Sequence, residues 1–134
     1  LFESAKSGSL RTIQGELATI MAGLACGEAS LLAWRILETG AHFFVTIPDA
    51  AAVETMRLLA RGCGGDRPIV GGESGVAGLA GLIACAGNAE TRRRVGLDAR
   101  STILTIGTEG DTDPELYERI VGRSAEEVLR GSEF

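Results

Sequence analysis

The sequence predicts an α/β protein with three layers: a mostly parallel sheet with helices on both of its faces. Three observations favour this class. Short runs of β-branched and apolar residues alternate with helical segments along the chain, as they do in parallel sheets with crossover helices. Glycine is abundant and only 4% of the residues are aromatic, so backbones are expected to pack closely. The 134 residues suit a single domain.

The first half of the chain alternates helix and strand around glycine and proline. A helix that is already under way at Leu1 should end at Gly8, because glycine readily takes the left-handed conformation found at helix ends. Pro48 should end a strand, because it has no amide hydrogen for a sheet. The elements expected between them are a short strand at 10–13, a loop with a helical turn at 15–28, a helix at 30–39 and a strand at 43–47.

The second half carries stronger helix-start signals. Asp49 and Asp113 are good N-caps, and Asp113 is followed by Pro114, which favours the first helical position. Residues 124–127 form a capping box that starts a last turn. The expected elements are a helix from Asp49 to a glycine turn at 62–65, a strand at 68–70, a helix at 74–86, a polar helical turn at 88–97, a strand at 102–106 and a helix at 115–121.

Two glycine-rich loops follow strands of the predicted sheet. The first glycine loop, residues 71–75, contains Glu73 and Ser74, and the second glycine loop spans residues 107–111. Ligands of parallel sheets bind beyond the carboxyl ends of the strands. Ser74 is a good N-cap for the following helix, and a helix N-terminus attracts anions. Two such loops predict a ligand site, although a glycine turn with a purely structural role is an equally simple interpretation.

Composition excludes several partners. The formal net charge is −5, which argues against a nucleic acid or an anionic membrane surface. The three cysteines form no CxxC pair, so a disulfide framework or zinc site is not expected and a reducing cytoplasmic setting is favoured. No signal-peptide pattern is visible at the start. The apolar run from Ile69 to Gly87 is interrupted by Glu73, which favours a buried helix over a membrane span.

Three runs together resemble the C-terminal part of the diaminopropionate ammonia-lyase family: Thr19–Glu28, Gly72–Gly75 and Thr108–Pro114. These lyases are pyridoxal-phosphate enzymes of fold type II, related to the tryptophan synthase β subunit and threonine deaminase. The resemblance implies α,β-elimination of 2,3-diaminopropionate to pyruvate and ammonia, with the cofactor as electron sink. It implies that residues 1–130 are the C-terminal portion of the catalytic large domain. Residues 131–134, Gly-Ser-Glu-Phe, are interpreted as a cloning scar and excluded.

The resemblance also implies a partial cofactor site. Thr108 would place a hydroxyl against the pyridine nitrogen, although the family often has serine where Gly107 stands here. Glu73 would line the cofactor ring, with a helix-capping role as the alternative, and Ser74 is a further cofactor-binding candidate. The family's Schiff-base lysine and phosphate loop lie outside this region, and Lys6 is the only lysine. The resemblance therefore implies a small amino-acid substrate, a homodimeric parent and an inactive fragment, with no catalytic residue in this chain.

Two other functions are compatible with parts of the sequence. An α/β interaction or regulatory module would need no cofactor, and the sequence upstream would distinguish it. A serine hydrolase would use Ser74 as nucleophile and His42 as base. This alternative is weaker, because Val76 stands where the nucleophile-elbow motif requires a glycine. Covalent labelling of Ser74 by a fluorophosphonate would support it.

Overall fold

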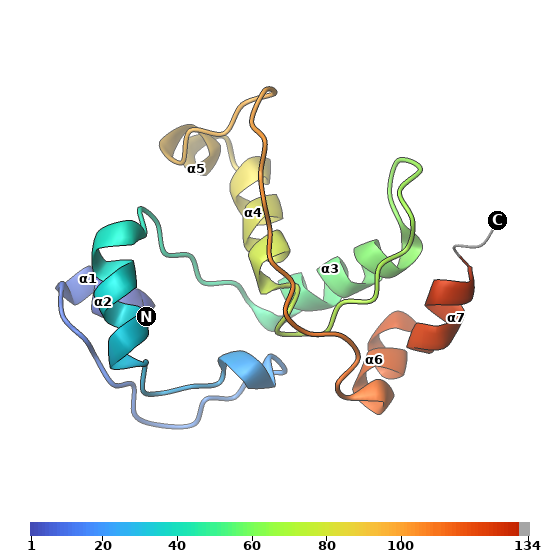
Figure 1. The fold of residues 1–134 in the computed structure, drawn as a ribbon, viewed down its shortest axis with the longest axis horizontal. Coiled ribbons are helices and arrows are strands. Elements are labelled where there is room, and N and C mark those ends of the chain that lie inside the picture. The colour runs from blue at the N-terminus through green and yellow to red at the C-terminus, as the bar shows by residue number, and fades with distance from the viewer. Residues whose placement is uncertain (132–134) are drawn as a thin grey trace. The chain divides into compact units, whose positions relative to one another are not determined.

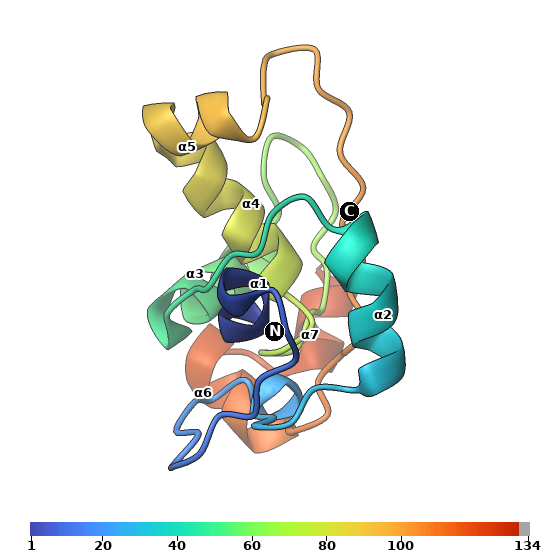
Figure 2. The ribbon, with the colours of Figure 1, turned by 90° about the vertical axis from the view of Figure 1, so that its left-hand side faces the viewer.

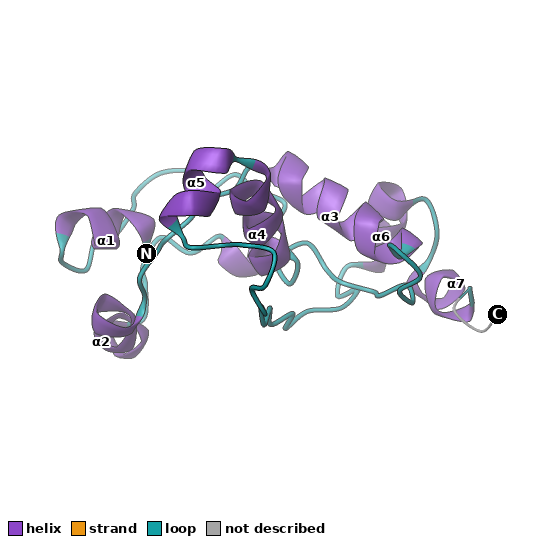
Figure 3. Ribbon diagram, turned by 90° about the horizontal axis from the view of Figure 1, so that it is seen from above, coloured by secondary structure: helices purple, strands orange, loops and turns teal. Residues whose placement is uncertain are grey.

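The structure, a computed structural model, describes residues 1–131. These residues form seven α-helices and one short 3-10 helix, and none of them lies in a β-strand (Figures 1 and 3). The chain divides into two compact units, one spanning Leu1–Thr46 and the other beginning at Ile47. Of the proposed cloning scar at 131–134, residues 132–134 lie outside the described residues.

Local signals determine the helices of the first unit. Gly8 ends the first helix with a φ of 68°, and Ser30 caps the last one by accepting the N–H of Ala33 at 3.3 Å. Both helix ends are confirmed, and so is the loop with one helical turn between them. The elements are α1 (Phe2–Ser7), the 3-10 helix η1 (Ala22–Leu24) and α2 (Leu31–Gly40).

Few side chains of the first unit are buried. Trp34 of α2 is 5% exposed, and its ring centroid lies 6.4 Å from that of Phe44 in a tilted arrangement. Ser4 of α1 is fully buried, and its hydroxyl accepts the N–H of Arg11 at 3.0 Å. This bond satisfies the buried hydroxyl and holds the chain that follows α1 against the helix.

The second unit is a cluster of five helices. Helix α3 packs against both α4 and α6, while α5 contacts α4 and α7 contacts α6 (Figure 2). Two arginines connect α3 to the chain near the end of α6. Arg57 donates to the carbonyl of Ile120 at 2.9 Å, and Arg123 donates to the carbonyl of Ala60 at 2.8 Å. The helices are α3 (Asp49–Arg61), α4 (Ala77–Gly87), α5 (Ala89–Arg94), α6 (Pro114–Val121) and α7 (Ala125–Arg130).

The core of the second unit consists mostly of small side chains. The two largest buried side chains are Met56 and Tyr117, both 1% exposed. Met56 and Ala60 lie on the buried side of α3, whereas Val53 and Leu59 are partly exposed. The other buried side chains among the described residues of this unit are Ala52, Thr55, Ala60, Val76, Ala80, Cys85 and Val128, with Glu73, and the backbone of Gly71 and Gly72 is buried as well.

Two of the predicted helix starts are confirmed in detail. Asp113 accepts the N–H of Leu116 at 3.0 Å, with Pro114 as the first residue of α6. Ser124 and Glu127 form the predicted capping box of α7. The backbone N–H of Ser124, and then its hydroxyl, hold the pKa of Glu127 below the usual value. By contrast, Asp49 is not a cap: Pro48 precedes α3 and Asp49 is its first residue.

The predicted parallel sheet is not confirmed. Residues 10–13, 43–47, 68–70 and 102–106 were expected as strands, and all four run as loops (Figure 3). Their backbones make isolated bonds, such as Ile69 N–H to the carbonyl of Leu59 at 2.9 Å, instead of a ladder. Apolar side chains on these loops stay exposed, for example Leu104 at 85%. Strand propensity describes how side chains fit a half-buried sheet, so it is not realised without a paired neighbour.

The apolar run from Ile69 to Gly87 forms a loop and then helix α4, as the interruption at Glu73 predicted. Among residues 1–131, no helix has the length and apolar character needed to cross a membrane. The arginine cluster at 92–94 is exposed on α5.

Tyr117 provides a test of the second unit's core. Its hydroxyl is buried without a hydrogen-bond partner among the described residues, and burial, followed by the charge of Asp111, raises its pKa. An unpaired buried hydroxyl is unfavourable, so Tyr117→Phe should leave the free energy of unfolding unchanged or raise it by about 1 kcal/mol. Urea unfolding followed by circular dichroism measures this change.

Thr55→Val is the matched control, because the Thr55 hydroxyl is satisfied by the carbonyl of Ala51 at 2.7 Å. Removing that bond should lower the free energy of unfolding by about 1 kcal/mol. A loss of the same size in Tyr117→Phe would mean that the tyrosine hydroxyl has a partner in solution.

Candidate functional site

The structure brings the two glycine loops together. The N–H of Gly72 in the first loop donates to the backbone carbonyl of Glu109 in the second loop at 3.1 Å. Within the first loop, Val76 N–H donates to the carbonyl of Gly72 at 3.1 Å, which folds the chain into turns ahead of α4. The candidate residues Glu73 and Thr108 are therefore direct neighbours of the two residues through which the loops meet.

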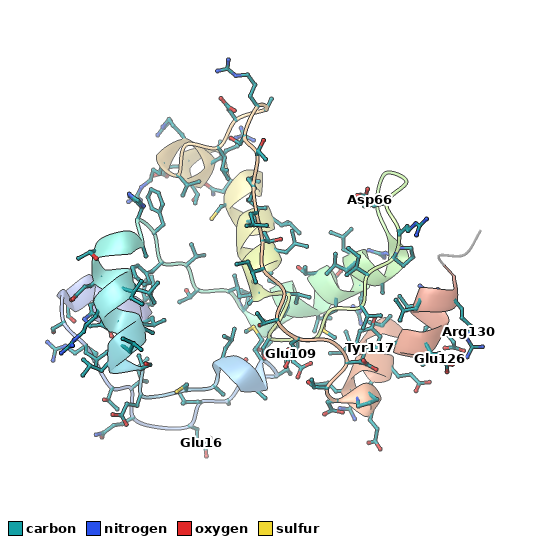
Figure 4. The ribbon with its side chains drawn as sticks, viewed as in Figure 1. Glu16, Asp66, Glu109, Tyr117, Glu126 and Arg130 are labelled. Atoms are coloured by element: carbon teal, nitrogen blue, oxygen red, sulfur yellow. The ribbon has the colours of Figure 1, made fainter. Side chains whose placement is uncertain are left out.

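A second contact joins the loops through a side chain. One carboxylate oxygen of Glu109 accepts the backbone N–H of Ser74 at 2.6 Å and that of Gly75 at 2.9 Å. The hydroxyl of Thr112 donates to the other oxygen at 3.3 Å. Bonds from backbone amides to a carboxylate are charge-assisted and stronger than neutral ones. The two amide bonds form the Glu109 bridge between the loops, and Figure 4 labels its carboxylate.

The glycines of the first loop make room for Glu109. A Cβ at Gly72 would overlap the carbonyl oxygen of Gly110 and lie 2.7 Å from Cγ of Glu109. A Cβ at Gly75 would lie 2.8 Å from the backbone oxygen of Glu109. Such approaches are too close for any side chain, so both positions require glycine. The sequence predicted that these glycines admit a ligand, but in this structure they admit the second loop of the same chain.

Ser74 does not cap the helix that follows it. Helix α4 begins at Ala77, two residues later than the capping role requires, and Val76 occupies the N-cap position. The prediction of Ser74 as N-cap is therefore wrong. The reason is the Glu109 bridge, in which the Ser74 backbone N–H donates to a carboxylate while residues 73–76 form turns.

Glu73 is the most unusual side chain near the bridge. It is 4% exposed. Among the described residues, the Tyr117 hydroxyl is the one fully buried side-chain polar atom that lacks a hydrogen-bond partner, so the carboxylate of Glu73 is not such an atom. The alternative role of Glu73, capping a neighbouring helix, has no supporting contact in residues 1–131. A glutamate side chain is rarely buried to this degree, so its position is worth testing. Thr108 differs, because it is exposed.

A shallow hollow lies beside the loops. Its volume is about 280 Å³, and it is lined on one side by Gly71 and Gly75 and on the other by Ile106, Gly107 and Glu109. Neither Glu73 nor Thr108 lines this hollow. It is therefore distinct from the candidate cofactor residues.

Glu109 is the residue that the sequence analysis missed. Its amide partners lie 34 and 35 residues earlier in the chain, and no local spacing reveals a contact over that distance. Two features could have suggested it: a carboxylate within the second glycine loop, and a first glycine loop whose amides attract an anion. The anion expected as a ligand is supplied by the chain itself.

Comparison with known proteins identifies the relatives of the chain. No family model matches it. It is 41% identical over 133 residues to the diaminopropionate ammonia-lyase of Salmonella typhimurium, covering 93% of this chain and 33% of that protein. It is 38% identical over 124 residues to the enzyme of the same name from Escherichia coli K12, covering 90% and 31%.

The same relationship appears in solved structures. The crystal structure of the Escherichia coli enzyme in complex with an aminoacrylate–pyridoxal phosphate azomethine intermediate matches with a TM-score of 0.79 and 37% identity, over 90% of this chain and 30% of that chain. The complex of that enzyme with D-serine matches with a TM-score of 0.76 and 34% identity, over 92% and 32%. The chain thus spans about a third of the length of these relatives. The resemblance expected from the sequence is confirmed: this chain is homologous to a segment of diaminopropionate ammonia-lyase.

Proposed function

We propose that the chain is part of a pyridoxal-phosphate-dependent lyase that converts 2,3-diaminopropionate to pyruvate and ammonia by α,β-elimination. The observation that carries the proposal is the contact between the two glycine loops, which brings the buried Glu73 and Thr108 next to the residues that join them. The relatives named above support it, because they are diaminopropionate ammonia-lyases and one of them was solved with pyridoxal phosphate as a reaction intermediate.

The residues of this junction fit the cofactor in part. Glu73 would line the cofactor ring. The exposed Thr108 would donate its hydroxyl to the pyridine nitrogen, leaving that nitrogen largely unprotonated. Any contact of Ser74 would come from its side chain, because its backbone N–H already donates to Glu109. When bound, pyridoxal phosphate supplies the electron sink for the elimination. A neutral donor at its nitrogen moderates this sink, which favours elimination over transamination.

The rest of the site belongs to other parts of the complete protein. Lys6, the only lysine, lies on the exposed face of α1 and pairs with Glu3 at 3.3 Å. The chain alone is therefore proposed to be inactive. In the complete protein, we infer that residues 68–70 and 102–106 pair with other strands in a parallel sheet. A homodimer in the cytoplasm is the assembly we propose for it.

The proposal is tested by assaying pyruvate release from 2,3-diaminopropionate in a full-length protein that contains this chain. Thr108→Val should lower kcat about tenfold or more and alter the absorbance of the bound cofactor, because one well-placed hydrogen bond to a cofactor is lost. Thr102→Val is the matched control, since Thr102 is exposed on the same loop away from the junction. It should leave both measurements unchanged.

Two results would contradict the proposal. One is a full-length protein that binds pyridoxal phosphate but releases no pyruvate from 2,3-diaminopropionate. The other is a stable, borohydride-reducible adduct of pyridoxal phosphate on Lys6 of the chain alone, because Lys6 is proposed to have no role in the site.

A further inference from the structure

We propose that Glu109 is a positioning residue, which fixes the first glycine loop against the second and so holds Glu73 beside Thr108. This inference rests on the proposed function, because the position of Glu73 and Thr108 matters only if both residues contact the cofactor. The contact itself stands on the geometry of the Glu109 bridge alone.

Two backbone amides in the turn ahead of α4 bind the carboxylate of Glu109. Backbone N–H groups in the turns ahead of a helix have no partner within the helix and favour a negative charge. Here the N–H groups of Ser74 and Gly75 both point to one oxygen of Glu109, at 2.6 and 2.9 Å. An internal carboxylate thus occupies the place where the sequence suggested an external anion.

The side chain of Glu109 is tightly enclosed by the first glycine loop and by Thr112. Gly72 and Gly75 both lie against Glu109, and neither has space for a Cβ. Thr112 donates to the second carboxylate oxygen at 3.3 Å. The side chain is therefore held from three directions: by amides, by a hydroxyl and by the glycine backbone. A shorter side chain would not reach the same amides, and a neutral one would bind them less strongly.

The Glu109 bridge lies next to both candidate residues, Glu73 and Thr108. Glu73 lies between Gly72, which bonds to the Glu109 backbone, and Ser74, which bonds to the Glu109 carboxylate. Thr108 directly precedes Glu109. Both candidate residues are thus adjacent in the chain to atoms of the bridge. If the bridge opens, the position of Glu73 relative to Thr108 is no longer fixed.

The first test measures the bridge without any cofactor. Hydrogen exchange of the backbone amides of Ser74 and Gly75 is followed in the chain and in Glu109→Ala. Loss of a charge-assisted bond should speed exchange by about 10- to 100-fold. Glu109→Gln retains an acceptor oxygen but no charge, so it should give a smaller increase. Glu118→Ala is the control, because Glu118 is exposed on α6 and forms none of these contacts.

The second test uses the full-length protein loaded with pyridoxal phosphate. Glu109→Ala should weaken cofactor binding and change the absorbance of the bound cofactor, and Glu109→Gln should restore both in part. Partial recovery by the conservative variant is expected of a positioning residue and not of a general loss of folding. Glu118→Ala should match the unmodified protein in both measurements.

Each outcome decides the inference. Unchanged amide exchange in Glu109→Ala would overturn it, as would faster exchange with unaltered cofactor binding and absorbance. An equal effect of Glu118→Ala would mean that both substitutions destabilise the protein generally, and it would also overturn the inference. Failure of the full-length protein to bind pyridoxal phosphate would instead refute the proposed function, because the exchange measurement does not depend on the cofactor.

Discussion

Gly72→Ala is expected to lower the free energy of unfolding of the second unit by about 1–3 kcal/mol, the usual cost of forcing an extra group into a packed site. The added methyl group would overlap the carbonyl oxygen of Gly110 and approach the Glu109 carboxylate to 2.8 Å. A backbone carbonyl cannot rotate away as a side chain can, so the two loops must separate. Urea unfolding followed by circular dichroism measures the loss.

Gly78→Ala is the matched control for this substitution. Gly78 lies inside α4, and a Cβ there meets no atom within 4 Å. Alanine in a helix interior is favoured over glycine, so this variant should gain about 0.5–1 kcal/mol. Gly72→Ala and Gly78→Ala should thus change stability in opposite directions. A gain in both variants would contradict the close approach of the two loops.

Met56→Ala is expected to cost about 2–5 kcal/mol, because it removes a buried side chain and leaves a cavity. Met56 is 1% exposed on α3, the helix that packs against both α4 and α6. Few large side chains are buried in this unit, so few neighbouring side chains can move to fill the cavity. The change is measured by urea unfolding of the chain, with thermal unfolding as an independent check.

The control is Leu104→Ala, at a residue of similar size that is 85% exposed. It should change stability by no more than about 0.5 kcal/mol, as exposed substitutions usually do. A loss as large as that of Met56→Ala would show that residues 102–106 are buried in solution, contrary to the structure.

Signals confined to a few neighbouring residues predicted the helices well. Asp113 with Pro114, and Ser124 with Glu127, start α6 and α7 as expected, because a cap bonds to amides only three residues away. Asp49 and Ser74 have the same chemistry, but the N-cap positions of α3 and α4 are occupied by Pro48 and Val76. Ser74 lies in the first glycine loop, whose conformation depends on the distant Glu109, and for this reason its predicted role as N-cap is wrong.

Features that depend on distant partners could not be predicted locally. The strand at 102–106 has suitable residues, but a strand exists only when another segment bonds to it, and the described residues provide none. The Glu109 bridge is similar, since it joins residues more than thirty positions apart. Sequence motifs nevertheless pointed to both glycine loops. These motifs did not reveal that Glu109 is the residue that joins the two loops.

The exposed apolar side chains of residues 102–106 have a practical consequence. Leu104 and Ile106 are 85% and 73% exposed on a segment with high strand propensity and unpaired backbone groups. Such segments readily pair with copies of themselves, so the isolated polypeptide should self-associate as its concentration rises. The net charge of −5 opposes this association through mutual repulsion, which added salt would screen. Dilute, low-salt buffer is therefore the condition in which the polypeptide should stay monomeric.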